Sequence, residues 1–264
     1  MKYETLRCEL DQDVAQITLN RPEKLNALTP QMQAELRQAL ARLESEGSTR
    51  CLVLIGAGRG FCAGADLSSG DFPVDENGEI DLGLSLELDF NPTIRALTRA
   101  PFPTVAAVNG PCVGAGMSLA LCCDLVLAAR SAYFSQAFCN VGLVPDAGST
   151  YFLPRLLGLS RATGMMLLGQ KISAEAAAEW GLIWRCVDDD ALLAEAHQFA
   201  RELCRKPTRT LALCRRALLA SSVNDLDRQL DLERDLQRTA GRTRDAQEGL
   251  TAFREKRTAR FTGA

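Results

Sequence analysis

The sequence predicts an α/β fold, in which short buried strands alternate with helices, followed by a region of charged helices. Three apolar runs, each long enough for one buried strand, cover residues 51–55, 104–108 and 125–129. Residues 117–123, between the last two runs, are apolar almost all round, as in a buried helix, and its first turn is expected in the preceding glycines. From about residue 191 the pattern changes to long amphipathic helices. A chain of 264 residues can bury a sizeable core of this kind.

The N-terminal segment has the pattern of a hairpin followed by a capped helix. Apolar and polar residues alternate over 3–9 and again over 14–19, as in a β-hairpin. A helix over about residues 31–46 has Thr29 and Pro30 at its start, which are favoured at that place.

Residues 68–91 mix glycine, proline and acidic residues. We expect a mobile loop that covers another part of the molecule, with a short helix entering around Leu84. A helix over 91–99 then leads into the strand at 104–108.

The later helices are expected at residues 160–168, 173–179 with a serine cap, 191–205, 208–220, 225–240 and 243–256. The helix at 225–240 has a narrow apolar stripe and a heavily charged reverse side. This pattern fits either a helical cap on the protein's own core or an oligomerisation layer. We favour oligomerisation, because so narrow a stripe needs a partner.

Composition excludes several functions. A net charge of −3 leaves no basic excess for a nucleic-acid backbone. No stretch has the length of a membrane span or the apolar core of a signal peptide, so we expect a soluble, cytoplasmic protein. The ten cysteines lack metal or disulfide spacing, and we expect them to be reduced. His197 is the only histidine, which argues against a histidine-based catalytic triad or metal site.

Two glycine-rich turns, at residues 56–67 and 109–116, each follow a predicted strand. Backbone N–H groups from two such turns could bind one carbonyl oxygen and stabilise an enolate. The alternative is that both turns are only tight connections. Between residues 100 and 170 the only carboxylates are Asp124 and Asp146, so a carboxylate base from this region must be one of them.

These turns resemble motifs of the crotonase (enoyl-CoA hydratase/isomerase) family, in the family's order and over essentially the whole chain. The matching segments are 21–28 (RPEKLNAL), 61–67 (FCAGADL), 107–116 and 142–148 (GLVPDAG). The resemblance implies a spiral of β-β-α units as a core over residues 1–195, with the acyl-CoA site. It also implies a helical oligomerisation region over 196–264, which forms a homotrimer or a hexamer.

The same resemblance implies roles for individual residues. The oxyanion hole falls on the N–H groups of Ala65 and Ala115, with Gly116 as the neighbouring candidate. No cofactor is implied, because coenzyme A is part of the acyl-CoA substrate. The positions implied to contact coenzyme A are Lys24, Leu25, Ala63, Asp66, Leu67, Phe253 and Lys256, the last two often from a neighbouring subunit.

The sequence departs from the hydratases of the family at both of their glutamates. Ser118 and Phe138 occupy those positions, and neither can act as a carboxylate base. Asp146 matches the aspartate of the family's single-base isomerases and is the candidate catalytic base, whereas Asp124 is expected to be structural.

Five further segments carry a finer resemblance, namely 143–146, 174–175, 180–184, 229–235 and 260–263. Through them the chain most resembles, within the family, isomerases of ring-epoxide thioesters in phenylacetate catabolism. This resemblance implies a single-base isomerase, with partner enzymes of phenylacetate or fatty-acid degradation. Two alternatives stay open: a broad-specificity enoyl-CoA hydratase and a non-catalytic acyl-CoA-binding scaffold.

Overall fold

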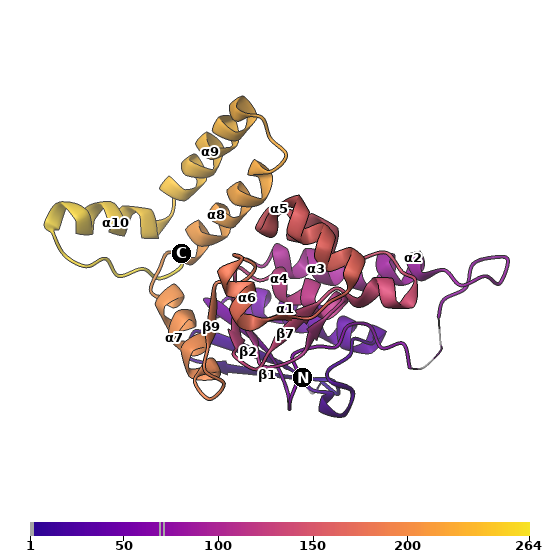
Figure 1. Cartoon of the computed structure of the whole chain (residues 1–264). Helices are drawn as coiled ribbons and strands as arrows, with labels where there is room; N and C mark the ends of the chain where they lie inside the picture. Colours follow the sequence, from indigo (N-terminus) through magenta and orange to yellow (C-terminus); the bar gives the residue numbers. More distant parts are fainter. Residues whose placement is uncertain (1–2, 69, 71) are drawn as a thin grey trace.

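The strands of the protein form two sheets. Figure 1 shows the whole chain. The computed structural model describes residues 3–68, 70 and 72–264. The main sheet has the order β1-β2-β3-β4-β6-β9, and a smaller sheet has the order β5-β7-β8. The main-sheet strands are β1 (Leu6–Asp11), β2 (Val14–Leu19), β3 (Cys51–Gly56), β4 (Thr104–Val108), β6 (Leu125–Ala129) and β9 (Arg185–Val187). The others are β5 (Cys112–Val113), β7 (Tyr133–Ser135) and β8 (Ile172–Ser173).

The predicted hairpin is confirmed, because β1 and β2 pair antiparallel. All later neighbours in the main sheet pair parallel, from β2–β3 to β6–β9. Every residue of β4 is buried, which explains its uninterrupted apolar run. The carboxyl ends of β3 and β4 lead into the two glycine-rich turns, so these turns meet at one edge of the sheet.

Helices cover the sheet. α1 (Pro30–Glu46) begins as predicted, with the Thr29 side chain accepting a hydrogen bond of 3.1 Å from the Met32 N–H. α7 (Leu192–Cys204) packs against β2, β3, β4 and β6. The expected boundary at residue 195 therefore falls inside a helix that lies on the main sheet, and the division into two domains remains a prediction.

The short helix expected around Leu84 is confirmed by α2 (Leu82–Ser85), but the helical segment is longer than expected, because it continues without a loop to residue 98. A π-helix η2 (Leu86–Phe90) and α3 (Asn91–Thr98) follow α2 directly. Asp81 begins this helical segment, since its Oδ1 accepts a hydrogen bond of 3.1 Å from the Leu84 N–H. A π-helix inside a helical run is often found at a functional site.

The buried helix α4 (Ala115–Leu121) has its first turn in the glycines, as predicted. α5 (Ser149–Leu168) begins earlier than the sequence predicts, at Ser149 rather than at residue 160. α5 contains a break at Gly158, where φ is 72° and ψ is 164°. α6 (Ala174–Glu179) has the predicted serine cap, because the Ser173 hydroxyl accepts from the Ala176 N–H at 3.2 Å.

The C-terminal helices α8 (Thr208–Ser221), α9 (Leu226–Gly241) and α10 (Arg244–Glu255) extend away from the sheets (Figure 1). They expose several large apolar side chains to solvent, namely Leu218, Val223, Leu226, Leu230, Leu250 and Phe253. Such a surface fits the predicted oligomerisation region, which remains a prediction. Of the helices in the described part of the chain, none is both long and apolar enough to cross a membrane.

Candidate active site

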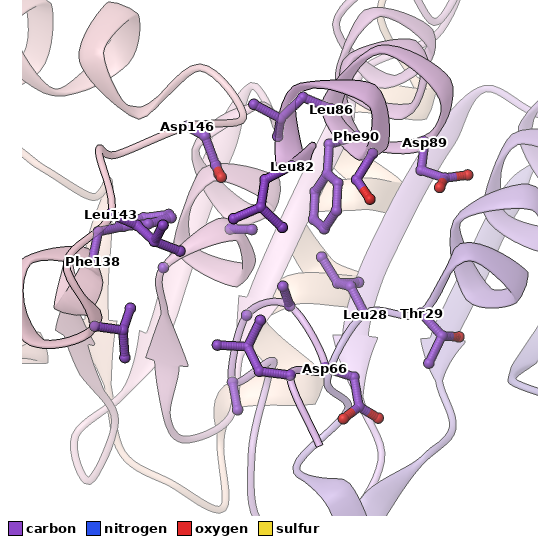
Figure 2. Close-up of a pocket in the computed structure, with 18 of the residues that line it drawn as sticks. Leu28, Thr29, Asp66, Leu82, Leu86, Asp89, Phe90, Phe138, Leu143 and Asp146 are labelled. Atoms are coloured by element: carbon purple, nitrogen blue, oxygen red, sulfur yellow. The ribbon is translucent and has the colours of Figure 1, made fainter. Parts of the chain in front are cut away.

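A largely apolar cavity of about 320 Å³ lies where the two glycine-rich turns meet (Figure 2). Its walls come from both turns, from α2 and η2, and from the segment around Asp146. The lining residues most relevant to function are Ala63, Ala65, Asp66, Leu67, Leu82, Phe90, Ala115, Phe138, Leu143 and Asp146.

The first turn is held in a fixed conformation by pairing with residue 28. The Leu28 N–H donates to the Gly64 carbonyl at 2.7 Å, and the Asp66 N–H donates to the Leu28 carbonyl at 2.9 Å. These bonds form a parallel bridge between Leu28 and Ala65. In a parallel bridge, the N–H of the residue between the two bonds points to the opposite side. The Ala65 N–H therefore points away from Leu28, and Ala65 lines the cavity.

The second turn brings Ala115 next to the first. Gly114 has φ 53° and ψ −127°, a conformation that favours glycine, and its N–H donates to Ser135 O at 2.9 Å. A Cβ added at Gly64 would lie 3.0 Å from Val113 O and 3.6 Å from Ala115 N. Only glycine at residue 64, which has φ 97°, lets the turns come this close without strain.

The N–H groups of Ala65 and Ala115 are available to a ligand. Within residues 3–68, 70 and 72–264, neither group donates a hydrogen bond to a protein acceptor. Ala115 is the first residue of α4, where an N–H has no partner within its own helix and the helix dipole favours negative charge. The two groups are suited to stabilise a carbonyl oxygen that gains negative charge.

Asp146 lies in a tightly constrained turn before α5. Its carbonyl accepts hydrogen bonds from Ser149 N at 2.9 Å, Ser149 Oγ at 2.8 Å and Ser118 Oγ at 3.3 Å. The next residue, Ala147, has φ 49°, a left-handed conformation that costs a residue with a Cβ about 1–2 kcal/mol. Backbone strain of this type is often found at functional sites.

The Asp146 carboxylate faces the cavity (Figure 2). Its Oδ1 atom is buried and has no hydrogen bond to any part of the chain that the structure describes. Desolvation by burial raises the pKa of Asp146 from 3.8 to about 6. A carboxyl group with this pKa can both accept and return a proton near neutral pH.

The other acidic side chains of the cavity are paired. Asp66 lies 2.7 Å from the Arg21 guanidinium, and its carboxylate points away from Asp146 (Figure 2). Hydrogen bonds from Ser68 and Arg21 lower the pKa of Asp66 to about 2. Asp89, on η2, lies 3.8 Å from the Arg37 guanidinium. Asp146 is therefore the cavity carboxylate best suited to proton transfer.

Phe138 and Ser118 occupy the positions of the two hydratase glutamates, but only Phe138 lines the cavity. The Phe138 ring lines the cavity and packs on Gly114, where an added Cβ would lie 3.6 Å from it. Ser118 is fully buried behind the cavity wall, and its hydroxyl lies 2.6 Å from the Ser149 hydroxyl. Ser118 thus supports the turn of Asp146 rather than lining the cavity.

The predicted coenzyme A positions fall into two groups. Ala63, Asp66 and Leu67 line the cavity, and Leu25 lies beside them, since its carbonyl accepts from the Ala63 N–H at 3.0 Å. Lys24 ends the short 3₁₀ helix η1 (Pro22–Lys24) just before Leu25.

The remaining predicted positions do not line the cavity of this chain. Phe253, 83% exposed, and Lys256 lie on and just after α10, outside the cavity lining. Gly116 packs against Cys62, whose carbonyl would lie 2.5 Å from an added Cβ. The roles of all the predicted site residues remain predictions.

The sequence does not single out Leu82, Leu86 and Phe90, which form one wall of the cavity. They lie in the segment expected to be a loop with a short helix near Leu84, and the π-helix η2 changes their spacing from that of an α-helix. Asp124 lies outside the cavity lining and pairs with Arg215 of α8 at 2.6 Å, in agreement with the structural role expected of it. In the described part of the chain, no three His, Cys, Asp or Glu side chains are grouped so that they could hold a metal ion.

Comparisons with known proteins place the chain in a family. Residues 9–264 match the family model described as enoyl-CoA hydratase/isomerase. The chain is 49% identical over 261 residues to the 1,2-epoxyphenylacetyl-CoA isomerase of Escherichia coli (strain K12), covering 98% of this chain and 99% of that protein. It is 44% identical over 263 residues to a Rhodobacter capsulatus protein named "Probable enoyl-CoA hydratase", covering 100% of both.

The fold agrees with these sequence matches. The crystal structure of an enoyl-CoA hydratase from Bacillus anthracis superposes with a TM-score of 0.90 at 32% identity, covering 99% of this chain and 100% of that chain. The α/β core with C-terminal helices is therefore the crotonase fold predicted from the sequence. The chain belongs to the enoyl-CoA hydratase/isomerase (crotonase) family.

Proposed function

We propose that the protein is an acyl-CoA isomerase that acts through a thioester enolate and a single base, Asp146. The observation that carries this proposal is one carboxylate that faces a cavity with two backbone N–H groups, none of which has a partner among the described residues. The reaction needs both features. A thioester enolate must be stabilised at its oxygen, and one group must move a proton between two carbons.

The Ala65 and Ala115 N–H groups bind the thioester oxygen in this mechanism. Their hydrogen bonds strengthen as negative charge develops there, so they stabilise the enolate more than the bound substrate. The carbon next to the thioester becomes acidic as a result. Because both groups belong to rigid turns, little reorganisation is needed during the reaction.

Asp146 transfers the proton. In a 3-enoyl thioester, the carboxylate removes a proton from carbon 2, and the electron pair of that C–H bond enters the dienolate. The protonated carboxyl then returns the proton to carbon 4, which gives the 2-enoyl thioester with no net gain or loss of atoms. A pKa of about 6 suits both steps.

Water does not add to the substrate in the proposed reaction. Hydration needs one group to activate water and another to handle the proton at carbon. The two positions that supply glutamates in hydratases carry a buried serine, Ser118, and an apolar ring, Phe138, in this chain. Apolar residues of the cavity, including Leu82 and Phe90, keep the intermediate away from water.

The acyl group is best matched by an aromatic ring 1,2-epoxide thioester, as the name of the Escherichia coli relative indicates. The product we propose for it is an oxepin, which the resemblance to that group of isomerases implies through segments 143–146, 174–175, 180–184, 229–235 and 260–263. The aromatic and leucine side chains around the cavity suit a ring. Isomerisation of 3-enoyl to 2-enoyl thioesters would use the same base.

Coenzyme A binding is proposed to use more than one subunit. Leu67 lines the cavity, and Lys24 and Leu25 would contact coenzyme A beside it, while Phe253 and Lys256 would reach coenzyme A from a neighbouring copy in a homotrimer or a hexamer. The exposed apolar residues of the C-terminal helices fit such an assembly.

A second candidate function is a broad-specificity enoyl-CoA hydratase, which the name of the Rhodobacter capsulatus relative favours. Product analysis with a 3-enoyl-CoA and with crotonyl-CoA separates the two. Isomerised 2-enoyl product and very little 3-hydroxyacyl product support the isomerase. Dominant 3-hydroxyacyl product from both substrates contradicts it. Tight thioester binding without any product would instead indicate a binding scaffold.

A further inference from the structure

Arg21 joins two segments beside the cavity that are far apart in sequence. Its Nη2 lies 2.7 Å from Asp66 Oδ2, and its Nη1 donates to Ala27 O at 2.6 Å. The side chains of Arg21 and Asp66 are only 19% and 10% exposed. One guanidinium group therefore connects the residue before Leu28 to the residue after Ala65.

Arg21 lies beside the Leu28–Ala65 bridge, which fixes the direction of the Ala65 N–H. The Leu28–Ala65 bridge has one hydrogen bond on each side of Ala65, from Leu28 to Gly64 and from Asp66 to Leu28. The ion pair with Arg21 holds Asp66, whose N–H donates one of these two hydrogen bonds. A shift of Asp66 would rotate the peptide plane between Gly64 and Ala65, and with it the direction of the Ala65 N–H.

The other end of the connection is fixed to the core. The Arg21 N–H donates to Asn26 Oδ1 at 2.9 Å, and Asn26 Nδ2 donates to Ala57 O at 2.9 Å and Gly60 O at 2.8 Å. Asn26 is fully buried and has φ 57°. Asn26 thus holds Arg21 to the turn after β3, and Arg21 holds Asp66 in turn.

The hydrogen-bonding capacity of Asp66 is used within the protein. Its Oδ1 accepts from the Ser68 N–H at 3.1 Å and the Ser68 hydroxyl at 2.6 Å, and its Oδ2 accepts from Arg21. A carboxylate would also repel the phosphates of coenzyme A. These contacts fit a positioning role better than the direct contact with coenzyme A that the family resemblance implies for Asp66.

We propose that Arg21 and Asp66 are positioning residues that aim the Ala65 N–H at the thioester oxygen. This inference rests on the proposed function, because it gives the Ala65 N–H its role in oxyanion binding. Misplacing a catalytic group by about 1 Å can lower a rate by about 100-fold. Breaking the ion pair should therefore reduce carbonyl polarisation and turnover more than thioester binding.

The test uses a conjugated thioester, cinnamoyl-CoA, as a probe of carbonyl polarisation. Its absorption shifts to longer wavelength when hydrogen bonds draw electron density toward the carbonyl oxygen. The shift, the dissociation constant, kcat, KM and the thermal transition are measured for wild type, Asp66→Asn and Arg21→Lys. Asp188→Asn is the matched control, since it removes an exposed ion pair with Arg130 outside the cavity lining.

We expect Asp66→Asn and Arg21→Lys to lose most of the red shift and to lower kcat by about 10- to 100-fold, with KM changed less than about threefold. Arg21→Lys loses the planar fork that contacts Asp66 and Ala27 together. Added guanidinium should restore part of the shift in Arg21→Ala. The Asp188→Asn control should keep the wild-type shift and kcat.

Two outcomes would overturn different claims. If wild type binds cinnamoyl-CoA with a red shift and both variants retain it together with kcat, the positioning role is wrong and the proposed function stands. If the variants lose thermal stability but keep the red shift and kcat, the positioning role is likewise wrong and the proposed function stands. If wild type itself shows no red shift on binding, the proposed function is wrong.

Discussion

Asp66 and Asp146 both line the cavity, each in its own turn, but the two carboxylates are used differently. In the turn with Asp66, the carboxylate accepts hydrogen bonds from Arg21 and Ser68, and its pKa is about 2. In the turn with Asp146, only the backbone carbonyl is held, and the buried carboxylate has a pKa of about 6. The same residue type thus supports structure in one turn and is suited to proton transfer in the other.

The difference arises from backbone geometry. The first turn pairs with Leu28 like a strand, which turns the Asp66 side chain toward Arg21. The turn with Asp146 uses two left-handed residues, Ala147 and Gly148, to begin α5. The Asp146 carboxylate thereby lies among apolar neighbours, with no counter-ion from the residues that the structure describes.

The largest expected effect comes from removing the reactive carboxylate. We expect Asp146→Asn to lower kcat for 3-enoyl-CoA isomerisation by about 10²- to 10⁴-fold, the usual contribution of a general base. The dissociation constant of the thioester should change little, because the amide has the same shape. Steady-state kinetics and calorimetric binding measure the two quantities. Near-normal turnover in the variant would show that another group moves the proton.

The next largest effect should come from the second oxyanion donor. Ala115→Pro removes one N–H at the first position of α4, where proline is tolerated, and should lower kcat by about 10²- to 10³-fold. Ala115→Gly keeps the N–H and should lose at most about tenfold, through added backbone freedom. Equal kcat values for the two variants would contradict the role of this N–H.

The pH dependence should distinguish the two carboxylates. Asp146 must be ionised to accept a proton, so kcat/KM should fall about tenfold per pH unit below about pH 6. Asp66 titrates near pH 2, and its ionisation should leave no trace in this range. A rate profile from pH 5 to 8 measures this, and a flat profile would mean that Asp146 is not the base.

The smallest effect is on stability. The folded-state pKa of Asp146 lies above its unfolded value of 3.8, so ionisation destabilises the fold. This cost is fully present above about pH 6 and fades as the pH falls toward 3.8. Discounted for solvent screening, Asp146→Asn should stabilise the protein by about 1–2 kcal/mol at pH 8, and by less at pH 5. Denaturant unfolding at both pH values tests this; a destabilised variant at pH 8 would contradict the desolvation argument.

The sequence predicts most of the core because burial dictates it. The apolar runs at 51–55, 104–108 and 125–129 are strands, as expected from side chains buried on both faces of a parallel sheet. Errors occur where glycine and proline interrupt a helix. Pro154 and Gly158 hide the first turns of α5, and the change from α2 to a π-helix hides the wall at residues 82–90.

The sequence predicts only part of the candidate site. Asp146 could be singled out because it is one of two carboxylates in a long apolar region. Other features of the site depend on tertiary contacts that leave no local sequence pattern. Among the described residues, Asp146 Oδ1 has no hydrogen-bond partner, and Asp66 pairs with Arg21, 45 residues away. The identity of the oxyanion donors came from the family resemblance, whereas the bridge that aims Ala65 is visible only in the structure.

The central claim is that Asp146 alone moves the proton at the thioester enolate, and exchange with heavy water tests it most directly. Wild type and Asp146→Asn are incubated with a 3-enoyl-CoA in deuterium oxide, and deuterium in substrate and product is measured by mass spectrometry. We expect isomerisation with exchange in wild type, and loss of both in the variant with thioester binding retained. Exchange at the wild-type rate in the variant, or a 3-hydroxyacyl product from wild type, would contradict it.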